Sequence, residues 1–330
     1  MFLLALSAAT LGEPTPGPFK TFGDWAVACD NVRRCEMTSL QPEDGDIDTS
    51  GAELSLTREP GPAGDLAISL WPAGDAPGTL TLTIDGKRIA SGAMEKGVLR
   101  VGGDAALQVA RALANGHSAQ ISVSAGGKTA RLSLAGASAA MRFLDSEQGR
   151  AGGVTALVAR GAKPANTVPA AAALPVVPAI RPSGQAATLS PALLAQLTKA
   201  NDCGEGYSAS FPQPEPETGA LGGGATLVLL ACGSGAYNLS SVAYVVRGGK
   251  ATAAHFDDGE GGPVELINAS WDPGSGTLST HGKGRGIGDC GEGASYVWDG
   301  TRFRLTEETR MDECRGSANW LTVWRATVRR

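Results

Sequence analysis

Apolar and polar residues alternate with a period of two through most of the first half of the chain. Between Lys20 and about Gly136 this alternation comes in short runs, and turn residues separate the runs. Because successive side chains of a strand point to opposite faces, the pattern predicts antiparallel strands. The runs are WAVACD, CEMTSL, AELSLT, DLAISLW, TLTLTI, VLRVGG, AQISVSA and TARLSLA, and hairpin turns are expected at DGK (85–87) and AGGK (125–128).

Two segments of this half follow a helical period instead. DAALQVARALANG has apolar residues at helical spacing, with Asp104 as the expected N-cap and Gly116 just past its end. SAAMRFLDSEQG predicts a second short helix with Ser138 as its cap.

A Pro/Ala-rich segment, 160–185, interrupts the pattern, and it carries little charge and no periodicity. Such a composition predicts an extended, semi-stiff linker that proteases reach first. The chain is therefore expected to divide into a signal-peptide-like segment (1–16), a β domain (17–159), the linker (160–185) and a second, disulfide-stapled β-rich domain (186–330).

The second domain is expected to open with a helix and continue in strands. Ser190 is a suitable cap, Pro191 fits the first helical position, and Leu193, Leu194 and Leu197 share one face. The GG turn of VVRGGKAT and the DG turn of VWDGTRFRL predict hairpins. The predicted fold is mainly β, with two antiparallel β-rich domains that each contain one or two short helices.

Composition limits the classes of partner. The 330 residues include 46 glycines and only 18% charged residues, and the net charge of −5 argues against nucleic acid. No stretch is long and apolar enough to predict a membrane span. The first residues, MFLLALSAATLGEPTPGPF, combine a short apolar run with small residues and a Pro-rich break, which is typical of the end of a secretory signal peptide. We expect a periplasmic or extracellular monomer.

The six cysteines predict three disulfides. An even count in an exported protein favours disulfides, and position along the chain favours local pairs. These pairs are Cys29–Cys35, Cys203–Cys232 and Cys290–Cys314. Zinc is the alternative, but no Cys-x₂-Cys spacing occurs and the three histidines are scattered. We therefore expect no metal and no cofactor.

The stretch KGRGIGDCGEG (283–293) has the glycine spacing of a dinucleotide-binding loop. Such a loop must open a helix, whereas the residues that follow here predict a β-hairpin. The glycines are better explained as turns. Lys283 and Arg285 on one face, with Arg315 brought near by Cys290–Cys314, are candidate binding residues for a carboxylate or phosphate. The alternative is that the cations of the loop pair with Asp289 or Glu292 on a solvated strand.

Other candidate chemistry is weak. HFDDGEGG offers His255, Asp257, Asp258 and Glu260 as a base or a metal site, and a solvated loop explains it equally well. Asp44, Asp46 and Asp48 begin like a calcium loop but lack its later glycine and glutamate. Four of the six tryptophans lie from Trp271 onward, where packing in the core competes with stacking on a sugar or peptide.

Several motifs carry a resemblance to known families. FKTFGDWAVACDNVRRC is similar to the start of the invasion-associated locus B family of exported bacterial proteins. The whole chain resembles the family called domain of unknown function 1176, through CDNVRRC, VTALVARGA, KGRGIGDCG, YVWDG and the final CRG with two tryptophans. The resemblance implies an exported protein of Gram-negative bacteria and supplies no reaction, ligand or catalytic residue.

The sequence thus favours a non-enzymatic module that binds an unidentified envelope component, and it leaves catalysis open. One alternative is a hydrolase of envelope polymers that uses carboxylates of the second domain. Another is an inhibitor of host lytic enzymes.

Overall fold

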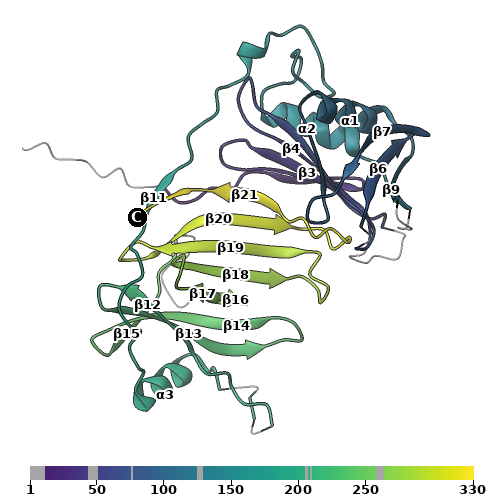
Figure 1. Ribbon diagram of the computed structural model, residues 1–330. Helices are drawn as coiled ribbons and strands as arrows, with labels where there is room; N and C mark the ends of the chain where they lie inside the picture. The colour runs from purple at the N-terminus through teal and green to yellow at the C-terminus, as the bar shows by residue number, and fades with distance from the viewer. Residues whose placement is uncertain are drawn as a thin grey trace, which may run out of the picture.

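The computed structural model describes residues 12–43, 51–75, 77–124, 129–204, 207–208, 210–257 and 264–330. Strands dominate these ranges (Figure 1), in several antiparallel sheets that do not close into a barrel. Three short α-helices accompany the sheets in the described ranges. The mainly β fold with minor helix is therefore confirmed. The expected AGGK turn and most of the signal-peptide-like segment lie outside the described residues.

The first half contains two sheets packed around two helices. Sheet one has the order β1-β2-β3-β4-β5-β8, and sheet two has the order β10-β9-β6-β7. Their strands are β1 Phe19–Phe22, β2 Trp25–Cys29, β3 Cys35–Ser39, β4 Glu53–Arg58, β5 Leu66–Trp71, β8 Leu99–Gly102, β10 Ala130–Leu132, β9 Ala119–Val123, β6 Thr79–Ile84 and β7 Lys87–Ala93. The inner faces of both sheets share one apolar core with the helices α1 (Gly103–Asn115) and α2 (Ala137–Glu147).

The two helices form where they were predicted, but their caps differ. Glycines occupy both N-cap positions: Gly102 before α1 and Gly136, in the left-handed region at φ 91°, before α2. Asp104 lies inside the first turn of α1, and Ser138 lies inside α2, so neither side chain caps its helix. The Cβ of any other residue at Gly136 would collide with the carbonyl of Phe22, which explains why glycine and not serine stands there.

The second half repeats the plan of sheets with one helix. One sheet has the order β12-β13-β14-β15 with β16 also paired to β14, and the other has the order β17-β18-β19-β20-β21. Their strands are β12 Glu217–Gly222, β13 Ala225–Ser234, β14 Leu239–Arg247, β15 Lys250–Ala253, β16 Glu265–Ile267, β17 Ser270–Asp272, β18 Thr277–Lys283, β19 Gly291–Trp298, β20 Phe303–Met311 and β21 Leu321–Arg325. The two sheets share a core, and helix α3 (Pro191–Ala200) covers the other face of β13 and β14.

Local turn chemistry explains the predicted boundaries in both halves. Ser190 accepts a hydrogen bond from the Leu193 N–H at 3.2 Å and caps α3, as predicted. Asp85 and Gly86 both have positive φ between β6 and β7, and so do Gly248 and Gly249 between β14 and β15. Two consecutive left-handed residues produce the two-residue turn that matches strand twist, so both hairpins are confirmed.

The Pro/Ala-rich segment runs along one side of the molecule (Figure 1), and part of it pairs with the end of the chain. Strand β11 (Val176–Pro178) forms a parallel pair with β22 (Thr327–Arg329), and the Ile180 N–H donates to the Trp298 carbonyl at 2.8 Å. A 3₁₀ turn at Ala165–Thr167 precedes it. The division of the chain at 160–185 stays a prediction.

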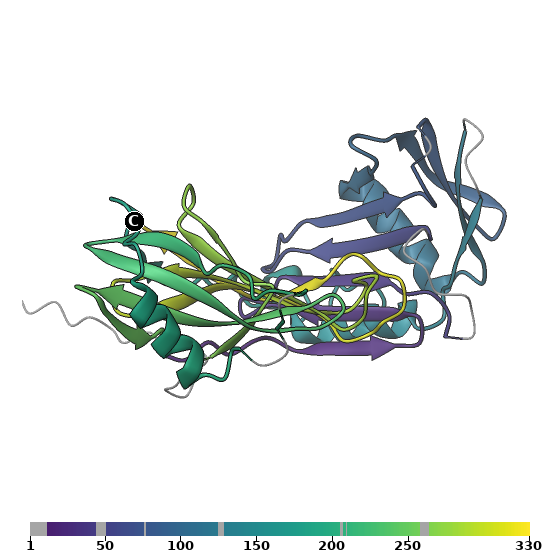
Figure 2. The same ribbon diagram turned by 90° about the horizontal axis from the view of Figure 1, so that it is seen from below.

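The two halves lie side by side in an elongated molecule (Figure 2) and share a small apolar core. Ala26, Ala28 and Leu40 of the first half pack against residues of the second half there, with all their side chains buried. The second-half residues are Cys290, Met311, Leu321 and Val323. Strand β21 therefore lies on the outer face of β2 and β3, and the halves meet over an ordered contact.

Candidate functional site

The three disulfides join the pairs that the sequence predicted: Cys29–Cys35, Cys203–Cys232 and Cys290–Cys314. The first joins directly opposite residues of β2 and β3. No cysteine among the six is free, so none offers a thiolate. Three disulfides indicate an oxidising, non-cytoplasmic location. Among the described residues, no helix has both the length and the apolar composition needed to span a bilayer.

The loop inside Cys29–Cys35 is organised by Asp30. The Asp30 carboxylate accepts hydrogen bonds from the Val32 N–H at 3.0 Å and the Arg34 N–H at 2.8 Å. Its second oxygen accepts from Arg325 Nε of β21 at 2.5 Å. One buried carboxylate therefore shapes the disulfide loop and ties it to the second half.

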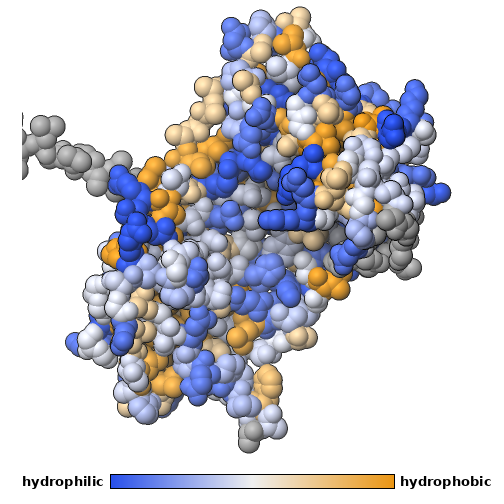
Figure 3. Space-filling model, in the orientation of Figure 1, coloured by the Kyte–Doolittle hydropathy of each residue, from blue (hydrophilic) through white to orange (hydrophobic). Residues whose placement is uncertain are grey.

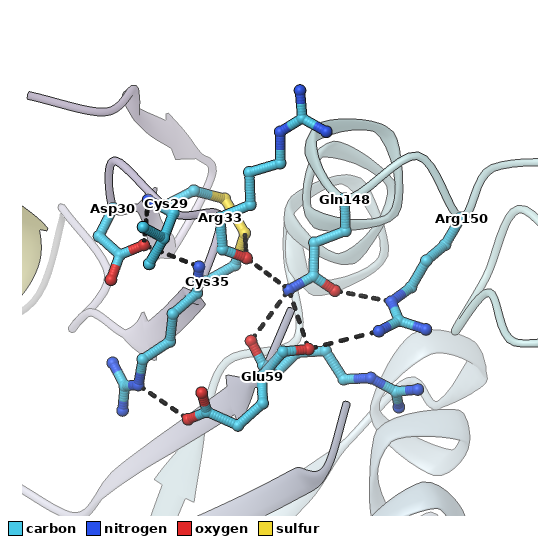
Figure 4. Close-up of a disulfide and its surroundings, with 10 residues drawn as sticks. Cys29, Asp30, Arg33, Cys35, Glu59, Gln148 and Arg150 are labelled. Carbon is cyan, nitrogen blue, oxygen red and sulfur yellow. Dashed lines mark hydrogen bonds and ion pairs between the residues drawn. A yellow bond between two sulfur atoms is a disulfide. The ribbon is translucent and has the colours of Figure 1, made fainter. Parts of the chain in front are cut away.

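A buried polar cluster lies beside this loop and bonds to it through the Arg33 carbonyl (Figure 4). Gln148 donates to the carbonyls of Arg33 and Arg58 and accepts from Arg150 Nε at 2.7 Å. Arg150 is fully buried and also donates to the Gly61 carbonyl. Burial, and secondarily the charge of Arg58, lowers the pKa of Arg150 to about 10, so its guanidinium stays protonated at neutral pH. The donors and acceptors of Gln148 and Arg150 bond to other groups of the protein, so we interpret this cluster as structural support for the loop.

Arg315 lies in the contact between the halves, where its guanidinium bonds to residues of the first half. Only 5% of it is exposed, and its guanidinium donates to the Gln41 carbonyl at 2.8 Å and the Gly23 carbonyl at 2.9 Å. It also pairs with Asp24. These bonds engage a cation that the sequence predicted to serve a ligand, and its part in binding stays a prediction.

Arg285 and Lys283 are differently placed. Arg285 Nε donates to the buried Asp289 at 2.7 Å, which is the pairing that the sequence left open as the alternative. Burial of Asp289 opposes its ionisation, but bonds from Arg285 and the Gly316 N–H outweigh burial and hold its pKa below the ordinary value. Lys283 has its backbone fixed by the Asn238 amide at 3.1 and 2.9 Å. No ion pair engages its amine within the described ranges.

Two exposed apolar side chains flank these cations, and the sequence did not indicate either as a site residue. Tyr237 is 42% exposed and its hydroxyl lies 3.3 Å from the Gly284 carbonyl, while Ile287 is 50% exposed. Gly286 faces the Tyr237 ring, and a Cβ there would lie in ordinary van der Waals contact with it. On the face of Figure 3, hydrophobic and hydrophilic residues are mixed and neither kind forms one broad patch.

A groove lies where the two halves meet, on the outer face of sheet one. Its volume is about 860 Å³, within the range of about 300–1,000 Å³ that holds small-molecule ligands. Trp71 and Glu53 stand directly opposite each other on β5 and β4, so their side chains are neighbours on one face. The other side chains and backbone that line it belong to Gly51, Pro72, Gly74, Asp75, Pro77, Gly78, Met94, Lys96, Gly97, Ala318 and Asn319; we call it the interdomain groove.

Contacts between the halves fix one wall of the interdomain groove. Glu53 accepts from Thr38 Oγ1 and from Ser317 Oγ, each at 2.6 Å, and from the Ala318 N–H at 3.3 Å. Asn319 donates through Nδ2 to Glu36 at 2.7 Å. The connection between β20 and β21 is thus held against sheet one, and it is anchored at its start by Cys290–Cys314.

The sequence contained a signal for Trp71 that the search for motifs missed. In DLAISLW the core residues are Leu66, Ile68 and Leu70. Trp71 therefore falls on the opposite parity, where an aromatic ring faces away from the core. The sequence contained no comparable indication for residues 318–319, which line the groove from the second half, because their position depends on long-range contacts.

The acidic stretches supply no metal site in the described residues. Asp257 pairs with Arg304 at 2.8 Å and accepts from the Leu305 N–H, so its carboxylate is engaged. Asp258 and Glu260 lie outside the described residues, as do Asp44, Asp46 and Asp48. Elsewhere in the described ranges, no group of three His, Cys, Asp or Glu residues is placed to hold an ion.

Comparisons with known proteins agree with the resemblance noted above. Residues 19–327 match the family described as "Protein of unknown function (DUF1176)". The chain is 30% identical to the uncharacterized protein YpfG of Escherichia coli K12, over 98% of this chain and 97% of that one. It is also similar to the crystal structure of invasion associated protein B from Bartonella henselae, with 17% identity and a TM-score of 0.29 over 40% of this chain and 99% of that one.

Proposed function

Since this chain belongs to the DUF1176 family, whose function is unknown, we propose from its geometry that it is a non-enzymatic binding module for an envelope component. The ligand site is the interdomain groove. The proposal includes export through a signal peptide to the periplasm or cell surface, and a monomer that binds no nucleic acid.

The observation that carries the proposal is a groove whose walls come from both halves and are fixed by buried bonds. Glu53 is held by three donors before any ligand arrives, and Arg315 fastens the same connection to Gln41 and Gly23. A site that is already ordered loses little entropy when it binds. Such rigidity suits recognition of a ligand by a fixed surface.

Catalysis has less support. A general acid or base needs a carboxyl that is free to exchange a proton with substrate, whereas Glu53 receives three hydrogen bonds from the protein and Asp257 is paired with Arg304. Asp257 lines a second pocket, but Arg304 pairs with both Asp257 and Asp299, so these two carboxylates give the hydrolase no free acid or base. No observation favours an inhibitor of lytic enzymes.

The surface of Lys283 and Arg285 is a second candidate contact, because Tyr237 and Ile287 add exposed apolar area beside an amine that pairs with no acid in the described ranges. Arg285 is a poor residue for a test, since its removal strands the buried Asp289. Lys283→Ala is the clean variant. If the surface binds an anionic envelope component, this change weakens capture at physiological salt, and unchanged capture argues against the contact.

The test of the groove compares binding of purified envelope fractions to the wild type, Trp71→Ala and Phe211→Ala. The fractions are cell-wall sacculi, lipopolysaccharide and solubilised outer-membrane proteins. Phe211 is 54% exposed and lies outside the groove, so its variant controls for loss of an exposed aromatic ring. We expect one fraction to bind the wild type and Phe211→Ala but not Trp71→Ala. Equal binding by all three proteins, or none by any, contradicts the proposal.

A further inference from the structure

Resting on the proposed function, we infer that the interdomain groove binds a polysaccharide chain, that is, a run of linked pyranose rings. The groove joins an aromatic surface to fixed hydrogen-bonding groups, and those two features match the two faces of a sugar. A pyranose offers C–H groups on its flat face and hydroxyls around its edge.

Trp71 supplies the aromatic surface. It stands at the end of β5 on the face opposite the core, and it is half-buried. The negative face of an indole attracts the weakly positive C–H groups of a sugar ring. Met94 lines the groove with it, which adds a second apolar contact.

Glu53 and Asn319 supply hydrogen-bonding groups of fixed position. Glu53 Oε1 receives the two short hydroxyl bonds, and among the described residues Oε2 receives one bond, from the Ala318 N–H at 3.3 Å. Oε2 therefore keeps lone pairs that can accept from a sugar hydroxyl. Asn319 uses its Nδ2 on Glu36, and its Oδ1 has no protein donor within the described segments. Both acceptors come from groups that the protein already holds in place.

Strand pairing argues against an extended peptide in the groove. A peptide that adds to a sheet needs an open edge with unpaired backbone groups. Strand β4 pairs with β3 and β5, and β5 pairs with β4 and β8. The strands that carry Glu53 and Trp71 therefore have no free edge beside them, so recognition has to use side chains.

Charge argues against a phosphate-rich ligand. The ionisable lining residues are Glu53, Asp75 and Lys96, two acids and one base, which gives a formal charge of −1. A lining with this net charge does not attract anions electrostatically. The hydroxyl groups of a neutral or N-acetylated glycan match it better.

The rim favours a chain over a single sugar. Gly74, Gly78 and Gly97 line the groove without side chains, so no large residue closes it at those points. A longer saccharide is then able to continue past the ring that stacks on Trp71. We expect affinity to rise from dimer to hexamer.

The test is isothermal titration of the full chain with defined saccharides: the β-1,4 N-acetylglucosamine dimer and hexamer, a β-1,4 glucose hexamer, and purified peptidoglycan glycan strands. The proteins are the wild type, Trp71→Phe, Trp71→Ala and the control Phe211→Ala, each with its melting temperature measured. We expect at least one hexamer or the strands to bind, Trp71→Ala to weaken that binding about tenfold or more, and Trp71→Phe to retain most of it.

Two failures are distinguishable. If no saccharide binds but an envelope fraction is still captured in a Trp71-dependent way, the glycan assignment is wrong and the proposed function survives. If saccharides bind equally to the wild type and Trp71→Ala, both proteins being folded, the groove is not the glycan site and the inference is overturned.

Discussion

Arg315 is the residue through which the contact between the halves is most directly tested. Its guanidinium donates to the carbonyls of Gln41 and Gly23, pairs with the carboxylate of Asp24 and forms a longer ion pair, at 3.7 Å, with the exposed Glu43. Arg315→Ala removes these interactions and leaves Asp24, which is 16% exposed in its side chain, without its cation.

The cost of this change can be worked from the structure. Removing one member of a buried ion pair costs about 3–5 kcal/mol, because the other charge stays out of water. Asp24 also accepts from Ser133 Oγ, which places the value at the lower end, and the two carbonyls that lose donors raise it again. We expect about 3–4 kcal/mol for alanine. Lysine should recover part of this, since it keeps the charge but lacks the planar fork.

Urea unfolding followed by tryptophan fluorescence measures the effect. With a slope of about 3 kcal/mol per M for a chain of this size, the midpoint of Arg315→Ala should fall by about 1 M. Arg310 is the matched control, because it pairs with Asp312 while both side chains are about 40% exposed or more. Arg310→Ala should cost less than about 0.5 kcal/mol. A midpoint shift for Arg315→Ala no larger than that of the control would refute the role of Arg315 between the halves.

Two further predictions concern pH and proteolysis. The folded pKa of Asp289 lies below the ordinary value of about 3.9 for an aspartate, so its bonds to Arg285 and Gly316 stabilise the fold above about pH 3.9 and are lost as the pH falls through the folded pKa. The difference in unfolding free energy between the wild type and Asp289→Asn should therefore close on acidification, and a difference that persists at the lowest pH would contradict this. Limited proteolysis should cut first in the exposed stretch 169–173, which lies between the buried Val168 and Val177. Because the halves share a core and the Arg315 bonds, the two fragments should co-elute in gel filtration without denaturant, and fragments that separate would show that the contact is weak.

The parts of the fold that local chemistry decides were predictable from sequence. Asp85–Gly86 and Gly248–Gly249 mark hairpins because few residues accept two consecutive positive φ values. Ser190 followed by Pro191 marks a helix start because the serine side chain accepts a bond from the first turn and proline fits the first helical position. The disulfide pairs followed from the position of the cysteines along the chain.

The cap of α2 was mispredicted because a tertiary contact overrides the local preference for a polar cap, whereas none of the described residues makes such a contact at Gly102 before α1. Gly136 has to pass against the backbone of Phe22, and a serine in that place has no room for its Cβ. The residues adjacent to Gly136 in the sequence do not indicate its contact with the backbone of Phe22.

Arg315 is a second residue whose environment depends on long-range contacts that the local sequence does not predict. The sequence placed its backbone near Lys283 through the Cys290–Cys314 bond, and Gly284 does lie against that disulfide. It could not give the direction of the side chain, which depends on Gln41 and Asp24, more than 270 residues away. The interdomain groove was out of reach for the same reason, although the parity of Trp71 was readable.

Hydrogen exchange of the wild type, with and without the envelope fraction that it captures, shows directly whether the interdomain groove is the binding site. We expect simultaneous protection of three segments, 71–75 and 94–97 in the first half and 318–319 in the second, because residues of all three line the interdomain groove. Protection confined to 283–289, with the groove segments unchanged, would contradict this expectation and assign binding to the surface of Lys283.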